Sequence, residues 1–137
     1  LLYDPAQWQV TPTVREHDRR SVYLVAKRNL RLPFMEVFDQ PDLLISCARR
    51  QASTHAPQAL EMLNGETAMD LAKAFAERLR LVAGDDERQQ VQIAFLIAAG
   101  REPTSSEMKL AAEFLKQQPL EELALAVFNL NAFLYVE

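Results

Sequence analysis

Cysteine, histidine and glycine are scarce in this chain. Its 137 residues contain one cysteine (Cys47), two histidines (His17 and His55) and three glycines. A single cysteine cannot form a disulfide within the chain, and so few ligands exclude a His/Cys zinc site of familiar spacing and a C-x-x-C-H haem attachment. We therefore expect this chain to hold neither a metal nor a cofactor.

Long hydrophobic runs are also missing. The longest apolar stretches, such as residues 93–99, are much shorter than the roughly 20 residues that cross a bilayer. No basic segment leads into an apolar one at the start of the sequence. The sequence therefore predicts no transmembrane segment, and its residues indicate no compartment.

Helix-favouring residues are plentiful instead. Ala, Leu, Glu, Arg and Gln are common, and no Asn-Gly or Asp-Gly dipeptide lies between alternating apolar runs. We expect an all-α protein, an irregular bundle of about five to six helices with a long ordered connection and an extended N-terminal arm.

The two halves of the chain differ in pattern. Residues 1–18 contain two prolines and no sustained period, so we expect an extended arm that is the remnant of a longer domain. Residues 19–137 are predicted to form a single helical domain. In it, an irregular basic segment at 31–56 precedes a helical bundle at 57–137.

The irregular first half offers two weak helix signals. Apolar spacing at 19–30 favours a helix, although residues 21–27 also fit a short strand because β-branched and aromatic side chains crowd them. One helical turn is expected near residues 34–38.

The second half has clear helical periods and helix-ending residues. Thr67 is predicted to cap a helix in which Val82 faces the core, and the all-apolar segment 93–99 is expected to be covered by its neighbours on most sides. Thr104-Ser105-Ser106-Glu107 is a capping box. The expected helices are 58–64, one from the Thr67 cap to about residue 83, one from about 87 to 99, one that Pro103 and Thr104 introduce and Pro119 interrupts, and a last one after Pro119. The last helix is expected to carry one stripe made of Leu120, Leu123, Val127, Leu130 and Leu134.

Charge is divided unevenly along a chain whose net charge is −4. Residues 14–50 carry eight Lys or Arg against five Asp or Glu, whereas residues 51–137 carry seven against thirteen. The acidic balance argues against a nucleic-acid partner. The basic pairs could grip a carboxylate, sulfate or phosphate, because guanidinium groups bind planar oxyanions with two hydrogen bonds. The ligand-binding candidates are Lys27, Arg28, Arg49, Arg50 and His55.

A structural role is the favoured interpretation of the same segment. An irregular stretch must satisfy many backbone carbonyls, and arginines paired with carboxylates do this well. Arg49 and Arg50, with Asp39 and Asp42, are predicted to hold the segment onto the bundle. The candidates for the whole polar network are Arg19, Arg20, Asp39, Asp42, Gln58 and Asn64.

The sequence contains no familiar catalytic motif. No Walker A loop, G-x-G-x-x-G, G-x-S-x-G, H-E-x-x-H or EF-hand pattern occurs. For His55 a capping or turn role is favoured over catalysis, and for Cys47 a small buried hydrophobe is favoured over a reactive thiol. No residue is assigned as catalytic.

Several ordered motifs resemble a known family. They are Arg19-Arg20-Ser21-Val22-Tyr23, Lys27-Arg28-Asn29, Phe38-Asp39-Gln40-Pro41-Asp42, Cys47, Arg49-Arg50, Gln58-Ala59-Leu60-x-x-Leu63-Asn64, Ala94-Phe95, Gly100-Arg101-x-Pro103-Thr104-x-x-Glu107 and Asn129-x-Asn131-x-Phe133-Leu134-Tyr135-Val136. Over residues 17–137 the chain resembles the domain of unknown function at the C-terminal end of large planctomycete proteins that also carry a cytochrome-c-like domain. It departs from the usual Thr-Pro before Gln-Ala-Leu, since His55-Ala56 precede Pro57 here.

The resemblance implies a bacterial multidomain protein of the periplasm or cell envelope, with a haem module elsewhere and no established reaction. The leading hypothesis is a non-catalytic scaffold or interaction domain whose partners are the other domains of its parent protein. One alternative is a ligand-binding or enzymatic module for an anionic or carbohydrate-like substrate, with His55 as acid or base. The other is a docking surface for the parent's haem domain.

Overall fold

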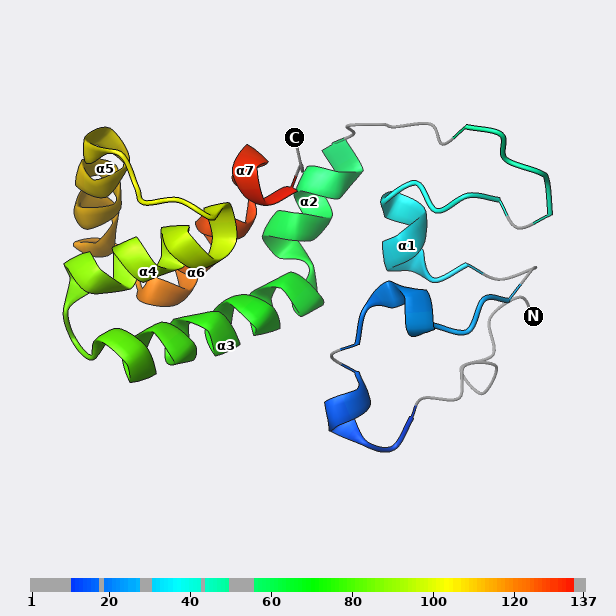
Figure 1. Cartoon of the computed structure of the whole chain (residues 1–137), viewed down its shortest axis with the longest axis horizontal. Coiled ribbons are helices and arrows are strands. Elements are labelled where there is room, and N and C mark those ends of the chain that lie inside the picture. The colour runs from blue at the N-terminus through cyan, green and yellow to red at the C-terminus, as the bar shows by residue number, and fades with distance from the viewer. Residues whose placement is uncertain (1–10, 18, 28–30, 43, 50–55, 135–137) are drawn as a thin grey trace.

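The chain folds into helices in the computed structural model (Figure 1). The structure describes residues 11–17, 19–27, 31–42, 44–49 and 56–134, and no strand occurs among them. Within these ranges, two 3-10 turns precede seven α-helices: η2 (Val14–Glu16), η3 (Ser21–Tyr23), α1 (Pro33–Val37), α2 (Ala56–Asn64), α3 (Glu66–Ala83), α4 (Glu87–Ala99), α5 (Ser105–Leu115), α6 (Leu120–Phe128) and α7 (Asn131–Leu134). The predicted all-α class is confirmed.

Helix α3 organises the bundle. Ala68, Ala72, Phe75 and Leu79 recur at intervals of four, three and four, which places them on one face of the helix. All four are buried. This face packs mainly against α6, and α3 also contacts α2 and α4. The small alanine side chains let the neighbouring helices approach closely, so the core of the molecule lies between α3, α4 and α6.

The turns on either side of α4 have the predicted helix-ending residues. Gly84 ends α3 with φ 59° and ψ −137°, and Gly100 ends α4 in the left-handed region with φ 66°. A side chain of Asp86 caps α4, because its Oδ1 accepts a hydrogen bond from the Gln89 amide at 3.1 Å. The predicted bounds of this helix are therefore confirmed.

The surroundings of α4 differ from the expectation. Val91, Ala94 and Phe95 are buried, but Leu96 is 47% exposed and Ile97 46% exposed. The helix contacts α3, α5, α6 and α7, and these neighbours do not cover the side that carries Leu96 and Ile97. The prediction that the segment is covered on most sides is wrong at these two residues.

Two details of α3 also correct the sequence interpretation. Its N-cap is Gly65 and not Thr67. The Gly65 carbonyl accepts the Met69 amide at 3.0 Å, so the helix begins at Glu66, earlier than predicted. Val82 is 60% exposed, and its neighbour Ala83 takes the buried position at the end of the helix.

The expected last helix is interrupted. Asn129 ends α6, where its side-chain Nδ2 donates to the Leu125 carbonyl at 2.9 Å and to the Met62 carbonyl of α2 at 3.3 Å. The side chain thus bonds the carbonyl that the amide of a continuing helix would take. The stripe divides accordingly, with Leu120, Leu123 and Val127 buried and Leu130 and Leu134 half-buried.

The helix expected at 19–30 is wrong for its described part, 19–27. Only the 3-10 turn η3 forms there, and Leu24 after it is extended. Val22 is 77% exposed and Val25 71% exposed. A short helix needs a buried apolar face to be stable in water, and this segment has none.

The helical turn expected near 34–38 is confirmed as α1. Pro33 occupies its first position, where a missing N–H costs nothing. Among the elements, α1 contacts only α2. Figure 1 shows α1 with the N-terminal turns on one side of α2 and the other helices on the opposite side.

Candidate functional site

The five predicted ligand-binding residues do not form a described site. Lys27 is half-buried and lines a small pocket of about 170 Å³ together with Arg31. Arg49 is exposed and is not among the residues that line it. Arg28, Arg50 and His55 lie outside the described residues. An anionic-ligand site therefore stays a prediction.

Gln58 joins the irregular segment to the bundle. Its Nε2 donates to the Val37 carbonyl at 2.9 Å and to Asp39 Oδ2 at 3.3 Å. Asp39 has φ 57°, a left-handed conformation that asparagine and aspartate tolerate better than most residues. The contact thus ties the end of α1 to α2 through one amide group.

The other members of the predicted network make local contacts. Arg19 lies 3.5 Å from Glu16 with both side chains exposed, and Asp42 Oδ1 accepts the Leu44 amide at 2.9 Å. The Arg20 carbonyl accepts the Tyr23 amide at 3.0 Å, and Asn64 is exposed at the end of α2. These contacts shape turns within the segment. The tie of Arg49 and Arg50 to the bundle stays a prediction, since Arg50 is outside the described residues.

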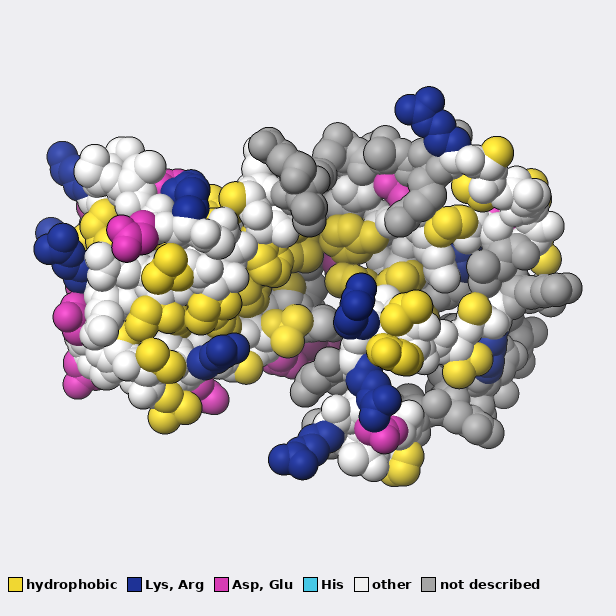
Figure 2. All heavy atoms as spheres, in the orientation of Figure 1, with side chains coloured by type: hydrophobic (Ala, Val, Ile, Leu, Met, Phe, Trp, Pro, Cys, Tyr) yellow, Lys and Arg dark blue, Asp and Glu magenta, His cyan; other side chains and the backbone are white. Residues whose placement is uncertain are grey.

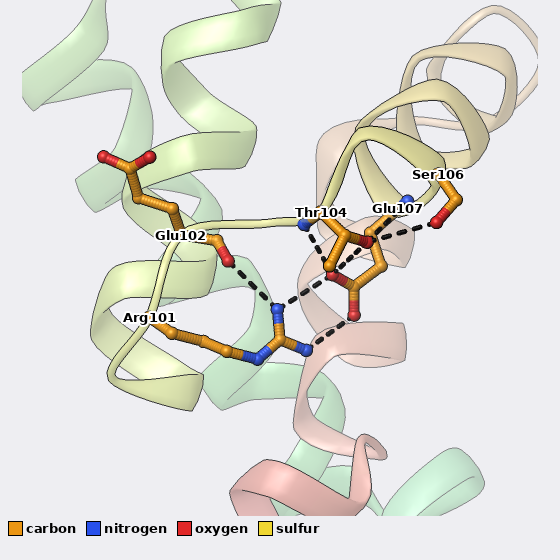
Figure 3. A network of polar contacts seen from close by, with 5 residues as sticks. All are labelled: Arg101, Glu102, Thr104, Ser106 and Glu107. Atoms are coloured by element: carbon orange, nitrogen blue, oxygen red, sulfur yellow. Dashed lines mark hydrogen bonds and ion pairs between the residues drawn. The ribbon is translucent and has the colours of Figure 1, made fainter.

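The strongest polar cluster lies between α4 and α5 (Figure 3). Arg101 forms a two-pronged ion pair with Glu107, with Nη2 to Oε1 at 2.7 Å and Nη1 to Oε2 at 2.8 Å. Glu107 Oε2 also accepts the Thr104 backbone amide at 2.7 Å and its hydroxyl at 2.8 Å. Arg101 and, after it, the Thr104 amide lower the pKa of Glu107 to about 2.

A second ion pair connects α3 to α6. Arg80 Nη1 lies 2.8 Å from Glu121 Oε1, and this hydrogen bond lowers the pKa of Glu121. The pair joins α3 to α6, and its two residues are 41 positions apart in the sequence. In both clusters the charged side chains are bonded to other side chains of this chain.

The polar residues that carry the family resemblance thus close helix ends and join helices. Gln58 connects α2 to α1, Arg101 and Glu107 close the start of α5, and Asn129 connects α6 to α2. Each of these groups is already bonded within the chain. This use favours a structural role for the motifs over a catalytic one.

The side chains with nucleophilic or metal-ligating chemistry are dispersed. Cys47 is exposed, which corrects the expectation of a buried thiol, and its Sγ donates to the Arg49 carbonyl at 3.3 Å. His17 Nε2 lies 2.7 Å from the Thr11 carbonyl. Within the described ranges no three His, Cys, Asp or Glu side chains gather as a metal site would require. No helix among those ranges is long and apolar enough to cross a membrane.

A further candidate site is an apolar groove of about 580 Å³, which we call the α3 groove. Its size falls in the usual range of ligand pockets. Phe34 of α1 and Phe38, which follows α1, contribute two rings whose centroids lie 4.9 Å apart. The Phe128 ring stacks on Phe133 at 5.1 Å between centroids and lies tilted against Phe75 at 5.4 Å. The groove is lined by Phe34, Phe38, Met62, Thr67, Ala68, Leu71, Ala74, Phe75, Arg78, Phe128, Phe133 and Leu134.

Sequence reasoning missed the α3 groove. Leu71, Ala74 and Arg78 follow each other at intervals of three and four, so they form a second stripe of α3 beside the core-facing one. This stripe was visible in the sequence. The facing wall from α1 was not, because it depends on how α1 packs against α2.

The comparisons with known proteins give a family. The model of the family described as PSD1, a protein of unknown function (DUF1553), matches residues 2–115. The chain belongs to the PSD1 family. The match reaches the end of α5 and covers most of the chain, which agrees with the resemblance to a domain of unknown function. No curated protein and no solved structure matches the chain. The PSD1 description names no reaction.

Proposed function

We propose that this PSD1 domain is a non-catalytic interaction domain that packs against other domains of a larger protein. Exposed apolar side chains on well-formed helices carry the proposal. Leu81 is 87% exposed on α3, and Leu110 is 67% exposed on α5. Leu96 and Ile97 add an exposed apolar pair on α4. Exposed apolar side chains that gather in one patch mark protein interaction sites.

The arrangement of this surface supports the proposal. Figure 2 shows apolar side chains gathered over the face that α3 and α4 present, continuing toward the hollow beside α2. Charged side chains also reach the surface beside these helices, such as Arg80 of α3, which is 44% exposed and pairs with Glu121 of α6. An apolar surface with a polar rim is the usual composition of an interface between domains.

The parent protein is proposed from the resemblance. It would be a planctomycete protein of the periplasm or cell envelope, with a cytochrome-c-like haem domain among the neighbours. This chain would then act as the scaffold against which the other domains dock, and the haem domain would be one candidate for its apolar surface.

The test is binding in trans between this chain and the remaining domains of its parent protein, measured by isothermal titration. Leu96→Glu with Ile97→Glu is expected to weaken binding at least tenfold, because two charges would enter an apolar interface. Lys109→Glu, at an exposed position of α5, is the matched control for added negative charge. Absence of binding by the unmodified chain would overturn the proposal.

A further inference from the structure

The apolar surface of α3 is wider than its neighbours cover. The core-facing stripe is buried, but Leu71 is 54% exposed, Leu81 87% and Val82 60%. At 100° per residue, Leu71, Ala74, Arg78 and Leu81 lie within one quarter of the helix circumference. From Leu71 to Leu81 this second stripe runs about 15 Å, or nearly three turns.

The stripe lies partly inside the α3 groove and partly beyond it. Leu71, Ala74 and Arg78 line the groove together with Phe34 of α1 and Phe38, the residue after it. Leu81 continues the stripe outside the groove. A compact small molecule would fill the groove and leave Leu81 in water. A helix of about three turns would cover the whole stripe. Amphipathic helices bind apolar grooves in this way, with their apolar face along the groove.

One charged side chain lines this groove, and the described residues leave it without an ion pair. Lys73 lies 3.1 Å from Asp70 and Arg80 lies 2.8 Å from Glu121. Arg78 has no carboxylate within 4 Å among the described residues. The positions three and four residues from it in α3 are Ala74, Phe75, Leu81 and Val82. Its guanidinium can therefore bind an acidic group supplied by an occupant.

We propose that the α3 groove binds an amphipathic helix that places apolar side chains along Leu71 and Leu81 and an acidic side chain against Arg78. The inference rests on the proposed interaction function and names the chemistry of the partner segment. The apolar residues supply the contact area, and the ion pair at Arg78 sets the orientation and selects partners of the right charge.

A display library of helical peptides tests the proposal. The peptides carry leucine at every third or fourth position with variable residues between them, and they are selected on the unmodified chain. We expect enriched peptides to carry an acidic residue and to bind at least tenfold more weakly to a Leu71→Asp and Leu81→Asp variant. Both substituted side chains are exposed, so the variant should keep the helical circular dichroism spectrum of the parent chain.

Charge exchange tests the orientation. Arg78→Glu is expected to weaken the enriched acidic peptides about tenfold, and lysine in place of the peptide's acid should restore binding to that variant. Lys109→Glu, on a helix away from the groove, is the control for added negative charge. Enrichment of no helix, or of helices indifferent to Leu71→Asp or Arg78→Glu, would overturn the proposal.

Two further results separate the proposals from each other. If dodecanoate binds in a manner that depends on Leu71 and Arg78 while no peptide does, the groove takes a free apolar carboxylate and the helix proposal is wrong. If the parent domains bind the chain and Leu71→Asp with Leu81→Asp changes nothing, the interaction function stands on the surface of Leu96 and Ile97, and neither the groove nor Leu81 is part of its site. If helical peptides are selected but the parent domains do not bind the chain, the groove proposal stands and the proposed function is wrong.

Discussion

Both carboxylate oxygens of Glu107 are bonded within the α4–α5 junction. Arg101 and the amide and hydroxyl of Thr104 supply the donors, and the Glu107 side chain is 28% exposed. The ionised form is therefore stabilised in the folded state, and the pKa falls from 4.5 to about 2. At the scale of one residue, the capping box of Thr104 and Glu107 therefore contributes directly to the stability of the fold.

The stability of the protein should depend on pH through Glu107. Because the folded-state pKa is the lower one, the contribution of the ionised group is fully present above pH 4.5 and is lost as the pH falls from 4.5 to about 2. After allowance for solvent screening, Glu107→Gln should cost about 1 to 2 kcal/mol at pH 7 and almost nothing near pH 2. Urea unfolding at several pH values measures this. A cost that stays constant with pH would contradict it, and exposed Glu113→Gln is the control.

The two glycines at the ends of α3 and α4 should differ in their tolerance of a side chain. Gly84, at φ 59° and ψ −137°, lies in a region that only glycine adopts readily, whereas Gly100, at φ 66° and ψ 11°, is left-handed. We expect Gly84→Ala to cost about 2 kcal/mol and Gly100→Asn about 0.5 kcal/mol, because asparagine tolerates the left-handed region. Chemical denaturation measures both, and equal costs would contradict the assignment.

Whether a polar contact could be predicted depends on how close its partners are in the sequence. The capping box at Thr104 and Glu107 was predictable, because all its partners lie within four positions. The bond from Asn129 to the Met62 carbonyl spans 67 positions, and no local pattern indicates it. The same holds for Arg80 and Glu121, which are brought together by the packing of α3 on α6.

At the scale of the element, α3 carries both buried and exposed leucines. Leu79 is fully buried, whereas Leu81, two positions later, is 87% exposed. We expect Leu79→Ala to lower the free energy of unfolding by about 3 kcal/mol, since it leaves a cavity between α3 and its neighbours. Leu81→Ala should change it by less than about 0.5 kcal/mol. Urea unfolding of both variants tests the assignment of the two faces, and a large loss for Leu81→Ala would contradict it.

Whether a periodic segment becomes a helix depends on what its apolar face meets. Residues 66–83 and 87–99 have neighbours on their core faces and form α3 and α4 as predicted. Residues 19–27 have comparable spacing but exposed valines, and they form only the turn η3. The spacing alone does not separate these cases, because the stabilising partner lies elsewhere in the chain.

At the scale of the whole molecule, the described part of the N-terminal segment is attached to the bundle at few points. Helix α1 contacts only α2 among the elements, and the Gln58 amide bonds the Val37 carbonyl and Asp39 across that contact. A small contact area with one polar tie predicts that this segment can open while the bundle stays folded.

Gln58→Ala should loosen α1 without unfolding the bundle. Loss of the two hydrogen bonds is expected to speed amide hydrogen exchange at residues 36–40, while the amides of α3 and α6 keep their protection. Hydrogen–deuterium exchange with mass spectrometry measures both regions. Gln92→Ala, at a half-buried position of α4, is the matched control, and uniformly faster exchange across the chain would contradict the prediction.

The sequence by itself determined the helical class and the main helix ends. It did so through short-range causes, namely glycines at the ends of α3 and α4, the cap at Asp86 and the capping box at Thr104. Only the tertiary structure decided that Val82, Leu96 and Ile97 face outward, that Asn129 divides the last helix, and that α1 and α3 enclose an apolar groove. These outcomes depend on which surfaces meet, and burial of an apolar side chain is a property of its neighbours rather than of its position in the chain.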